Sequence, residues 1–266
     1  HYLGNHLKDM WRLFIHTFSE IDRREIDEQD LSRSRIPIAL FCAGLSLLFV
    51  HYLKFNHVFY AFLEYIGGRG LVRSLGGYAE LYAHVWWSCV NVVGFVVMSL
   101  ACIKWILKDD LKYYHVGWGS THRHWKGYLA LLSSILIFVV LVTVFRKDFA
   151  EHYPFYRLAG RSAFDLLVWE FAYAIQFIAL EFFFRGFLLG ACKRQLGSNA
   201  IFVMMLPYLM FHFPKLWLEA SGALFFGLFL GMLALRSRSI WGGVIVHVCI
   251  AVSMDLAALI KRGALF

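Results

Sequence analysis

Two ionisable side chains four residues apart interrupt a long apolar stretch. Glu181 and Arg185 lie in residues 179–190, which read ALEFFFRGFLLG. On a helix, this spacing places both side chains on one face and within reach of each other. A charged group in hydrocarbon costs about 2.5 to 3.5 kcal/mol on insertion scales. Such groups therefore persist where they form a pair, line a polar cavity or take part in chemistry.

Two histidines in other apolar stretches could join this pair. His212 lies in PYLMFHFP and His247 lies in GGVIVHVCI. A carboxylate with two imidazoles can orient a water molecule and take up its proton, or His212 and His247 can hold a divalent metal such as zinc. The alternative is ordinary packing, because a histidine in a membrane helix is usually hydrogen-bonded to a neighbour. The H-E-x-x-H pattern of zinc proteases is absent from the sequence.

The composition indicates that these residues lie in a polytopic membrane protein. Of the 266 residues, 60% are hydrophobic and 17% are charged, whereas about a quarter of a soluble domain is charged. The apolar runs are about 20 residues long, which is the length needed to cross a bilayer. The net charge of +8 comes mostly from Lys and Arg between these runs. We therefore assign it to lipid headgroups and not to nucleic acid. The five cysteines lack C-x-x-C spacing, which indicates packing thiols.

We expect an all-α fold, a bundle of about seven or eight transmembrane helices behind an N-terminal amphipathic helix. Residues 1–35 form the interfacial N-terminal segment, residues 36–162 the first transmembrane helices and loops, and residues 163–266 the helices that carry the polar residues. The expected apolar helices are 36–52, 84–107, 128–145, 163–192, 201–213, 219–235 and 241–260. Residues 163–192 are too long for one perpendicular span, so they form either a strongly tilted helix or two helices with a break.

The N-terminal segment has apolar residues at three- and four-residue spacing, with basic residues on the opposite face. This pattern predicts an amphipathic helix that lies on a membrane surface or against a partner. Residues 25–35 read as a charged, solvated linker. Lys and Arg between the spans are more numerous on the N-terminal side, which favours a cytoplasmic N-terminus in a multi-pass protein.

Three further patterns affect packing or docking. The loop 111–127 holds His115, His122 and His124 among Trp, Tyr and basic residues. It forms either a metal site or, as its aromatic content favours, an anchor at headgroup depth. Glycines four residues apart at 186 and 190, and again at 227 and 231, offer small-residue faces on which helices can approach closely.

Three short motifs in the last third of the chain read LEFFFR (180–185), YLMFH (208–212) and HVCIA (247–251). They resemble the E-E-x-x-x-R, F-x-x-x-H and H-x-x-x-N motifs of the CPBP family of intramembrane proteases, which includes CAAX prenyl endopeptidases of the Rce1 type. The resemblance covers about residues 163–260 and agrees in motif order. It implies a helical membrane bundle whose site includes Glu181, His212 and His247.

Tyr208 for Phe in the second motif is a mild change, but two other motif positions depart from the family pattern by losing a polar group. Leu180 stands where the family has the glutamate thought to activate the hydrolytic water, and leucine cannot accept a proton. Ala251 stands where the family has an asparagine thought to stabilise the oxyanion. The resemblance also implies that Glu181 and Arg185 form a structural ion pair.

Two functions follow from the resemblance. In one, the protein is an active endopeptidase for membrane-associated or prenylated peptides, with Glu181, or Glu170 or Asp255 from elsewhere, as its base. In the other, it has weakened or lost hydrolysis and acts as a binding or scaffolding subunit with other membrane proteins. The loss of the base favours the second function, because general bases contribute about 10² to 10⁴ in rate. A transporter would require paired inverted repeats, and we detect none.

Overall fold

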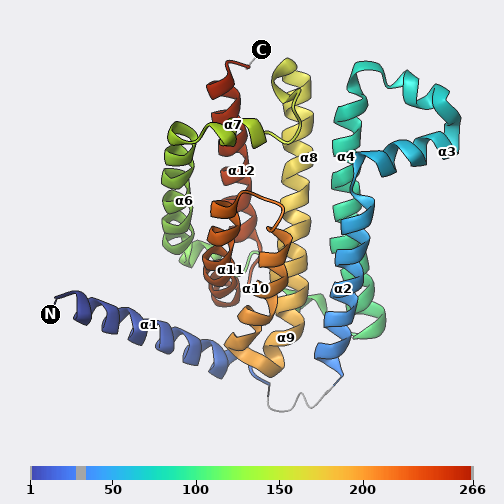
Figure 1. Cartoon of the computed structure of the whole chain (residues 1–266). Helices are drawn as coiled ribbons and strands as arrows, with labels where there is room; N and C mark the ends of the chain where they lie inside the picture. The colour runs from blue at the N-terminus through green and yellow to red at the C-terminus, as the bar shows by residue number, and fades with distance from the viewer. Residues whose placement is uncertain (1, 28–33, 265–266) are drawn as a thin grey trace.

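The chain folds into a bundle of membrane-length helices with a separate helix at its N-terminal end. The computed structural model describes residues 2–27 and 34–264, so residues 28–33 of the expected linker lie outside the described part. The predicted N-terminal helix is α1 (Tyr2–Glu25). It lies at one end of the bundle and is inclined to the long axis, while the C-terminus lies at the opposite end (Figure 1). The all-α prediction is confirmed.

Six stretches of the described residues are long and apolar enough to cross a membrane, so the predicted seven or eight was too high. They are α2 (Arg35–Leu53), Gly76–Ile106 with α4 (Ala79–Asn91) and α5 (Met98–Ala101), α6 (Trp125–Phe145), Ala163–Phe211, α11 (Trp217–Ser237) and α12 (Trp241–Arg262). The overcount came from α10 (Ala200–Phe211), which has 12 residues. At 1.5 Å per residue it is only about 18 Å long, roughly half a bilayer.

The long stretch that carries Glu181 is continuous but not uniform. It runs through α8 (Ala163–Glu181), a π-helical turn (Phe182–Leu188) and α9 (Leu189–Leu196). The structure therefore combines features of both expected arrangements, because the helix is continuous but a π-helical segment interrupts its regular α-helical geometry. The π-helical segment begins directly after Glu181, and every residue in it is buried. Such segments are rare and occur often at functional sites.

α10 brings the chain back to the middle of the bundle, and α11 follows it. α10 begins at the α1 end and rises to about half the height of the bundle, where a short turn leads into α11 (Figure 1). Gly227 and Gly231 of α11 face Tyr208 and Ile201 of α10, so this small-residue face does bring two helices together. Gly186 and Gly190 instead face Tyr114, which lies in a loop between spans. The turn after α10, which contains His212, therefore lies about halfway along the bundle.

Two other helices lie at the end opposite α1. α3 (Asn56–Ser74) extends sideways from the bundle (Figure 1). It bends at Gly68, whose φ of 65° is in the left-handed region that glycine adopts most readily. α7 (Lys147–His152) is a short helix between α6 and α8. α7 runs crosswise between α6 and α8 and packs against α12, whereas α3 lies beside α4 at the edge of the bundle (Figure 1).

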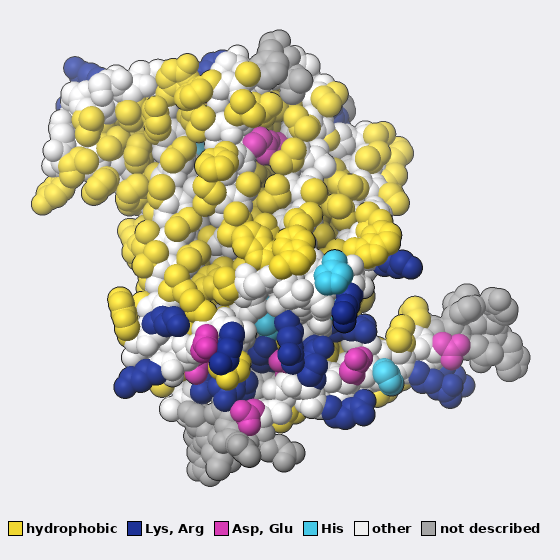
Figure 2. Space-filling view, turned by 180° about the vertical axis from the view of Figure 1, so that it is seen from behind, with side chains coloured by type: hydrophobic (Ala, Val, Ile, Leu, Met, Phe, Trp, Pro, Cys, Tyr) yellow, Lys and Arg dark blue, Asp and Glu magenta, His cyan; other side chains and the backbone are white. Residues whose placement is uncertain are grey.

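The surface pattern agrees with a bilayer environment. Apolar side chains cover a broad band, and charged side chains gather at the end where α1 lies (Figure 2). Ile21 of α1 is buried, and the Phe18 ring lies 6.0 Å from that of Phe202 in α10. Farther toward the N-terminus, Met10 and Trp11 are exposed. Whether a membrane surface or a partner covers them, and on which side of the membrane α1 lies, stay predictions.

The histidine-rich loop makes contacts inside the bundle. His115 is buried, its Nδ1 donates to the Arg185 carbonyl over 3.1 Å, and its Nε2 accepts from Lys193 Nζ at 2.6 Å. Lys193 also pairs with Glu25 of α1 at 3.0 Å. The position of this loop at headgroup depth stays a prediction, and the structure adds that His115 has an internal partner in Lys193 of α9. A polar chain thus links α1 to the backbone beside the Glu181–Arg185 pair.

This link predicts a pH-dependent stability. Burial, with the nearby Lys193 charge, lowers the pKa of His115 to about 3, whereas an unfolded histidine titrates near about 6.5. The unfolded chain therefore takes up the proton first, and stability falls as pH drops from about 6.5 toward 3, by at most about 1.4 kcal/mol per pH unit for this residue. We expect the fall in melting temperature between pH 7.5 and 5 to be smaller in His115→Gln than in wild type.

The exposed His122 provides the control for this experiment. His122→Gln is expected to keep the wild-type pH dependence, because it changes an exposed histidine of the same loop and leaves His115 and its buried partners in place. Equal pH dependence in the two variants would contradict the assignment to His115.

Candidate functional site

Glu181 and Arg185 form an ion pair in the centre of the bundle. Both side chains are fully buried, and Arg185 Nη1 lies 3.1 Å from Glu181 Oε1. The guanidinium also lies over the Tyr208 ring, with Cζ 4.1 Å from its centroid. No guanidinium nitrogen has a hydrogen-bond partner of good geometry among the described residues. The carboxylate and the aromatic ring are therefore what balance this buried charge.

The Glu181 carboxylate also faces α12. Its Oε1 lies 2.8 Å from His247 Nδ1. Gly243, one turn before His247, makes room for the carboxylate, because a Cβ atom at that position would overlap it. Glu181 is therefore held between Arg185 on its own helix and His247 on α12. Neither His247 Nδ1 nor the two carboxylate oxygens has a hydrogen-bond partner of good geometry among the described residues, so these contacts are electrostatic and steric.

Tyr208 connects the two histidines. Its hydroxyl lies 3.2 Å from His247 Nε2, and its carbonyl accepts a hydrogen bond of 2.8 Å from His212 Nδ1. The His247 ring is stacked on Phe177, 5.3 Å between centroids, and meets Phe226 edge-on at 4.8 Å. Both rings are thereby fixed in orientation. The sequence contained a signal for this role, since Tyr replaces Phe in the second motif.

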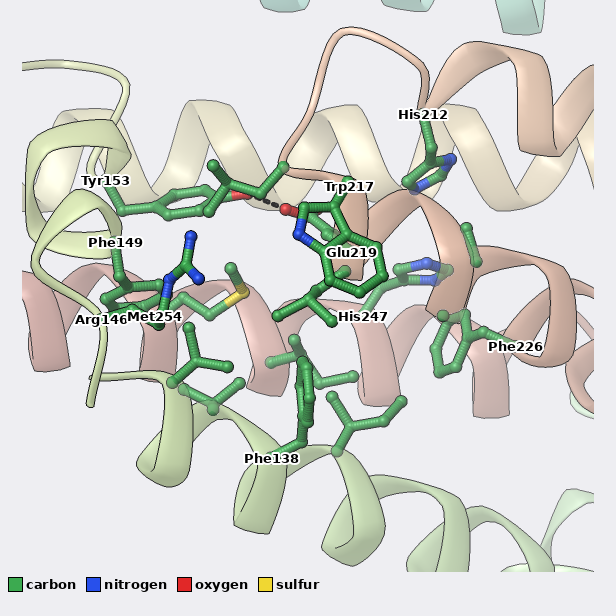
Figure 3. Close-up of a pocket in the computed structure, with 18 of the residues that line it drawn as sticks. Phe138, Arg146, Phe149, Tyr153, His212, Trp217, Glu219, Phe226, His247 and Met254 are labelled. Carbon is green, nitrogen blue, oxygen red and sulfur yellow. Dashed lines mark hydrogen bonds between the residues drawn. The ribbon is translucent and has the colours of Figure 1, made fainter. Parts of the chain in front are cut away.

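Two cavities meet at these histidines. The larger has a volume of about 170 Å³ and extends among α6, α7, α11 and α12, with Glu219 in its wall (Figure 3). The smaller has a volume of about 50 Å³ and lies between α4 and α8, with Leu180 and Asn91 in its wall. His212 and His247 line both cavities. A ligand in either cavity would therefore meet both imidazoles.

The two departures from the family motifs have different surroundings. Leu180 lines the smaller cavity beside the two histidines, so an apolar side chain occupies the position from which a carboxylate would face them. Neighbours on a helix are about 100° apart, and Glu181 accordingly points elsewhere. Ala251 packs in an apolar cluster with Trp169 and Tyr173 and lines neither cavity.

The carboxylates that we considered as substitutes lie outside the cavities. Glu170 and Asp255 line neither of them, and Asp255 accepts a hydrogen bond of 2.6 Å from the Trp169 indole. Glu219, which sequence reasoning missed, does line the larger cavity. It accepts a hydrogen bond from the Tyr153 hydroxyl (Figure 3). It accepts another from Lys215 Nζ at 2.6 Å. Its place at the start of α11 gives no local sequence signal, because only folding brings it near His212.

The residues present do not fit the zinc site considered for His212 and His247. A zinc ion in a catalytic site takes at least three protein ligands. Within the described ranges, no group of three His, Cys, Asp or Glu side chains is placed to hold a metal ion. That finding covers the described histidines of the 111–127 loop as well. The arrangement offers two imidazoles for hydrogen bonding and proton transfer.

Comparison with known proteins identifies the region that carries the site. Residues 162–253 match the family model described as Type II CAAX prenyl endopeptidase Rce1-like. This segment contains Glu181, Arg185, His212 and His247, and the match confirms the resemblance inferred from the three motifs. No curated protein and no solved structure matches the chain.

Proposed function

We propose that this Rce1-like intramembrane protease homologue binds a membrane-associated peptide, or a segment of another membrane subunit, with little or no hydrolysis. One observation carries the proposal: Leu180 faces the smaller cavity beside His212 and His247. A water molecule held by these imidazoles has leucine where a carboxylate base would stand. The cavities and the oriented histidines remain available for binding.

The neighbouring carboxylate supports the same conclusion. Glu181 is engaged by Arg185 and His247 and is enclosed by Gly243, so its oxygens are turned away from the smaller cavity. Moving it toward a substrate would leave Arg185 as a buried charge without its partner, which is strongly unfavourable. Glu181 therefore contributes to the shape of the site and to the orientation of His247.

Restoring the missing carboxylate tests this proposal. We would use synthetic peptides with one apolar span of about 20 residues, prenylated or not, that carry photo-leucine. We expect them to crosslink to the wild-type protein in detergent without being cleaved. Leu180→Glu is expected to cleave them at least about 100-fold faster, the lower range of a general base. Leu180→Gln, which has the same shape but no base, provides the control.

Two results would contradict the proposal. The first is a wild-type cleavage rate that equals that of Leu180→Glu and is abolished by His212→Ala. The second is the absence of any crosslink between the peptides and the wild-type cavities.

The position of Glu219 favours a second candidate function, an active endopeptidase. Two described carboxylates, Glu219 and Asp148, line the larger cavity together with both histidines. In this case the wild-type protein cleaves the peptides, and Glu219→Gln slows cleavage by about 10² to 10⁴. Glu170→Gln, which changes a carboxylate outside both cavities, should then leave the rate unchanged. The same peptides thus distinguish the two functions.

A further inference from the structure

A chain of hydrogen-bonded side chains crosses the interface between α4 and α8. Ser88 donates to the Ala172 carbonyl at 2.7 Å, and Gln176 Nε2 donates to Ser88 Oγ at 3.0 Å. Asn91 Nδ2 then donates to Gln176 Oε1 at 2.9 Å. Because a backbone carbonyl can only accept, it fixes the donor direction along the whole chain. The amide orientations of Gln176 and Asn91 follow from it.

Asn91 ends this chain at the smaller cavity. The residue is 3% exposed, and its Oδ1 atom has no hydrogen-bond partner among the described residues. Its amide nitrogen has a second hydrogen beyond the one given to Gln176. Buried polar atoms are rarely left unpaired, because an unmade hydrogen bond is costly. The carboxamide therefore presents one acceptor and one donor to whatever occupies the cavity.

The shape and lining of the cavity indicate the class of ligand. A peptide group offers one N–H donor and one carbonyl acceptor, which is the complement of the free edge of Asn91. The volume of about 50 Å³ exceeds the roughly 10 to 15 Å³ that a single water molecule needs. His212 and His247 line the same cavity, so a peptide group at Asn91 lies beside both imidazoles.

We infer that Asn91 binds a peptide group of the segment that occupies the site, and that Gln176 and Ser88 are positioning residues for it. This inference rests on the proposed function and specifies how the bound segment is held. It assigns to α4 an amide in the wall of the cavity that both histidines line, although the third motif lacks its asparagine. The contribution comes from the N-terminal half of the chain, outside the segment that matches the family model.

Backbone esters in the probe peptide test this contact. Each peptide bond near the photo-leucine is replaced in turn by an ester, which removes one N–H donor. We expect one ester position to weaken crosslinking to the wild-type protein by about three- to tenfold, the effect of one buried hydrogen bond. In Asn91→Leu that ester and the parent peptide should crosslink equally. Because the comparison is made within each protein, a general loss of stability does not imitate it.

Two further variants separate positioning from general packing. Gln176→Leu frees the Asn91 side chain to rotate and is expected to reduce the ester effect, whereas Gln176→Glu keeps the acceptor and should retain it. Ser99→Ala provides the control, because Ser99 is a buried hydroxyl in the same span that lines neither cavity. It should leave the ester effect unchanged.

The outcomes distinguish this inference from the proposed function. The inference alone would be overturned if the wild-type protein crosslinks and no ester position weakens the crosslink. It would also be overturned if the ester effect persists in Asn91→Leu. Either result would leave water as the partner of Asn91. The absence of any wild-type crosslink would overturn the proposed function and this inference with it.

Discussion

Arg185→Leu is expected to lower the free energy of unfolding by about 3 to 5 kcal/mol, because it leaves the buried Glu181 carboxylate without its partner charge. Both side chains are fully buried and 3.1 Å apart, so solvent cannot compensate for the loss. Glu181 would keep its contact with the His247 ring, which does not replace the guanidinium charge. Thermal or denaturant unfolding in detergent measures this effect.

The double variant provides the critical control. Glu181→Leu together with Arg185→Leu removes both charges, and replacing a buried ion pair by apolar residues is often neutral or stabilising. We therefore expect the double variant to be more stable than Arg185→Leu alone. If the two changes were simply additive, Glu181 and Arg185 would not act as a pair.

Gly243→Ala is expected to destabilise the protein by about 1 to 3 kcal/mol, the usual cost of overpacking a filled core. The added methyl group would overlap the Glu181 carboxylate. That carboxylate cannot easily move aside, because Arg185 and His247 hold it. Thermal unfolding measures the effect, and a displaced Glu181 should also reduce crosslinking at the histidines.

Gly44→Ala in α2 is the matched control. A Cβ atom at Gly44 meets no other atom within 4 Å, and alanine is the better helix former by about 1 kcal/mol. The control variant should therefore be as stable as wild type or slightly more so. Equal losses in both variants would mean that helix flexibility, not the space around Glu181, explains the result at Gly243.

The sequence predicted the apolar helices closely because hydropathy and helical spacing are local properties. The predicted run 36–52 corresponds to α2 and the run 241–260 to α12, each within two residues at either end. The expected count of spans exceeded the six candidate spans because α10 was counted as one, and its apolar composition does not reveal that it has only 12 residues. α10 ends at Phe211 and packs against α11, and a hydropathy profile does not describe such packing.

The motifs selected the candidate residues of the last third, but not how these residues face each other. Glu181 and Arg185 were expected to pair because a four-residue spacing is a property of one helix. The distance from Glu181 to His247, and the link through Tyr208, join three different helices. The expected substitutes Glu170 and Asp255 were chosen by residue type, and the fold places them outside both cavities.

By itself, the sequence determined that this is a helical membrane protein, that Glu181 and Arg185 share a helix face, and that Leu180 and Ala251 depart from the family motifs. Only the tertiary structure decided that Leu180 faces the histidines, that Ala251 does not, and that Asn91 and Glu219 reach the cavities. The physical reason is that residue type and spacing determine the face of one helix. Which faces meet depends on the packing of helices far apart in the chain.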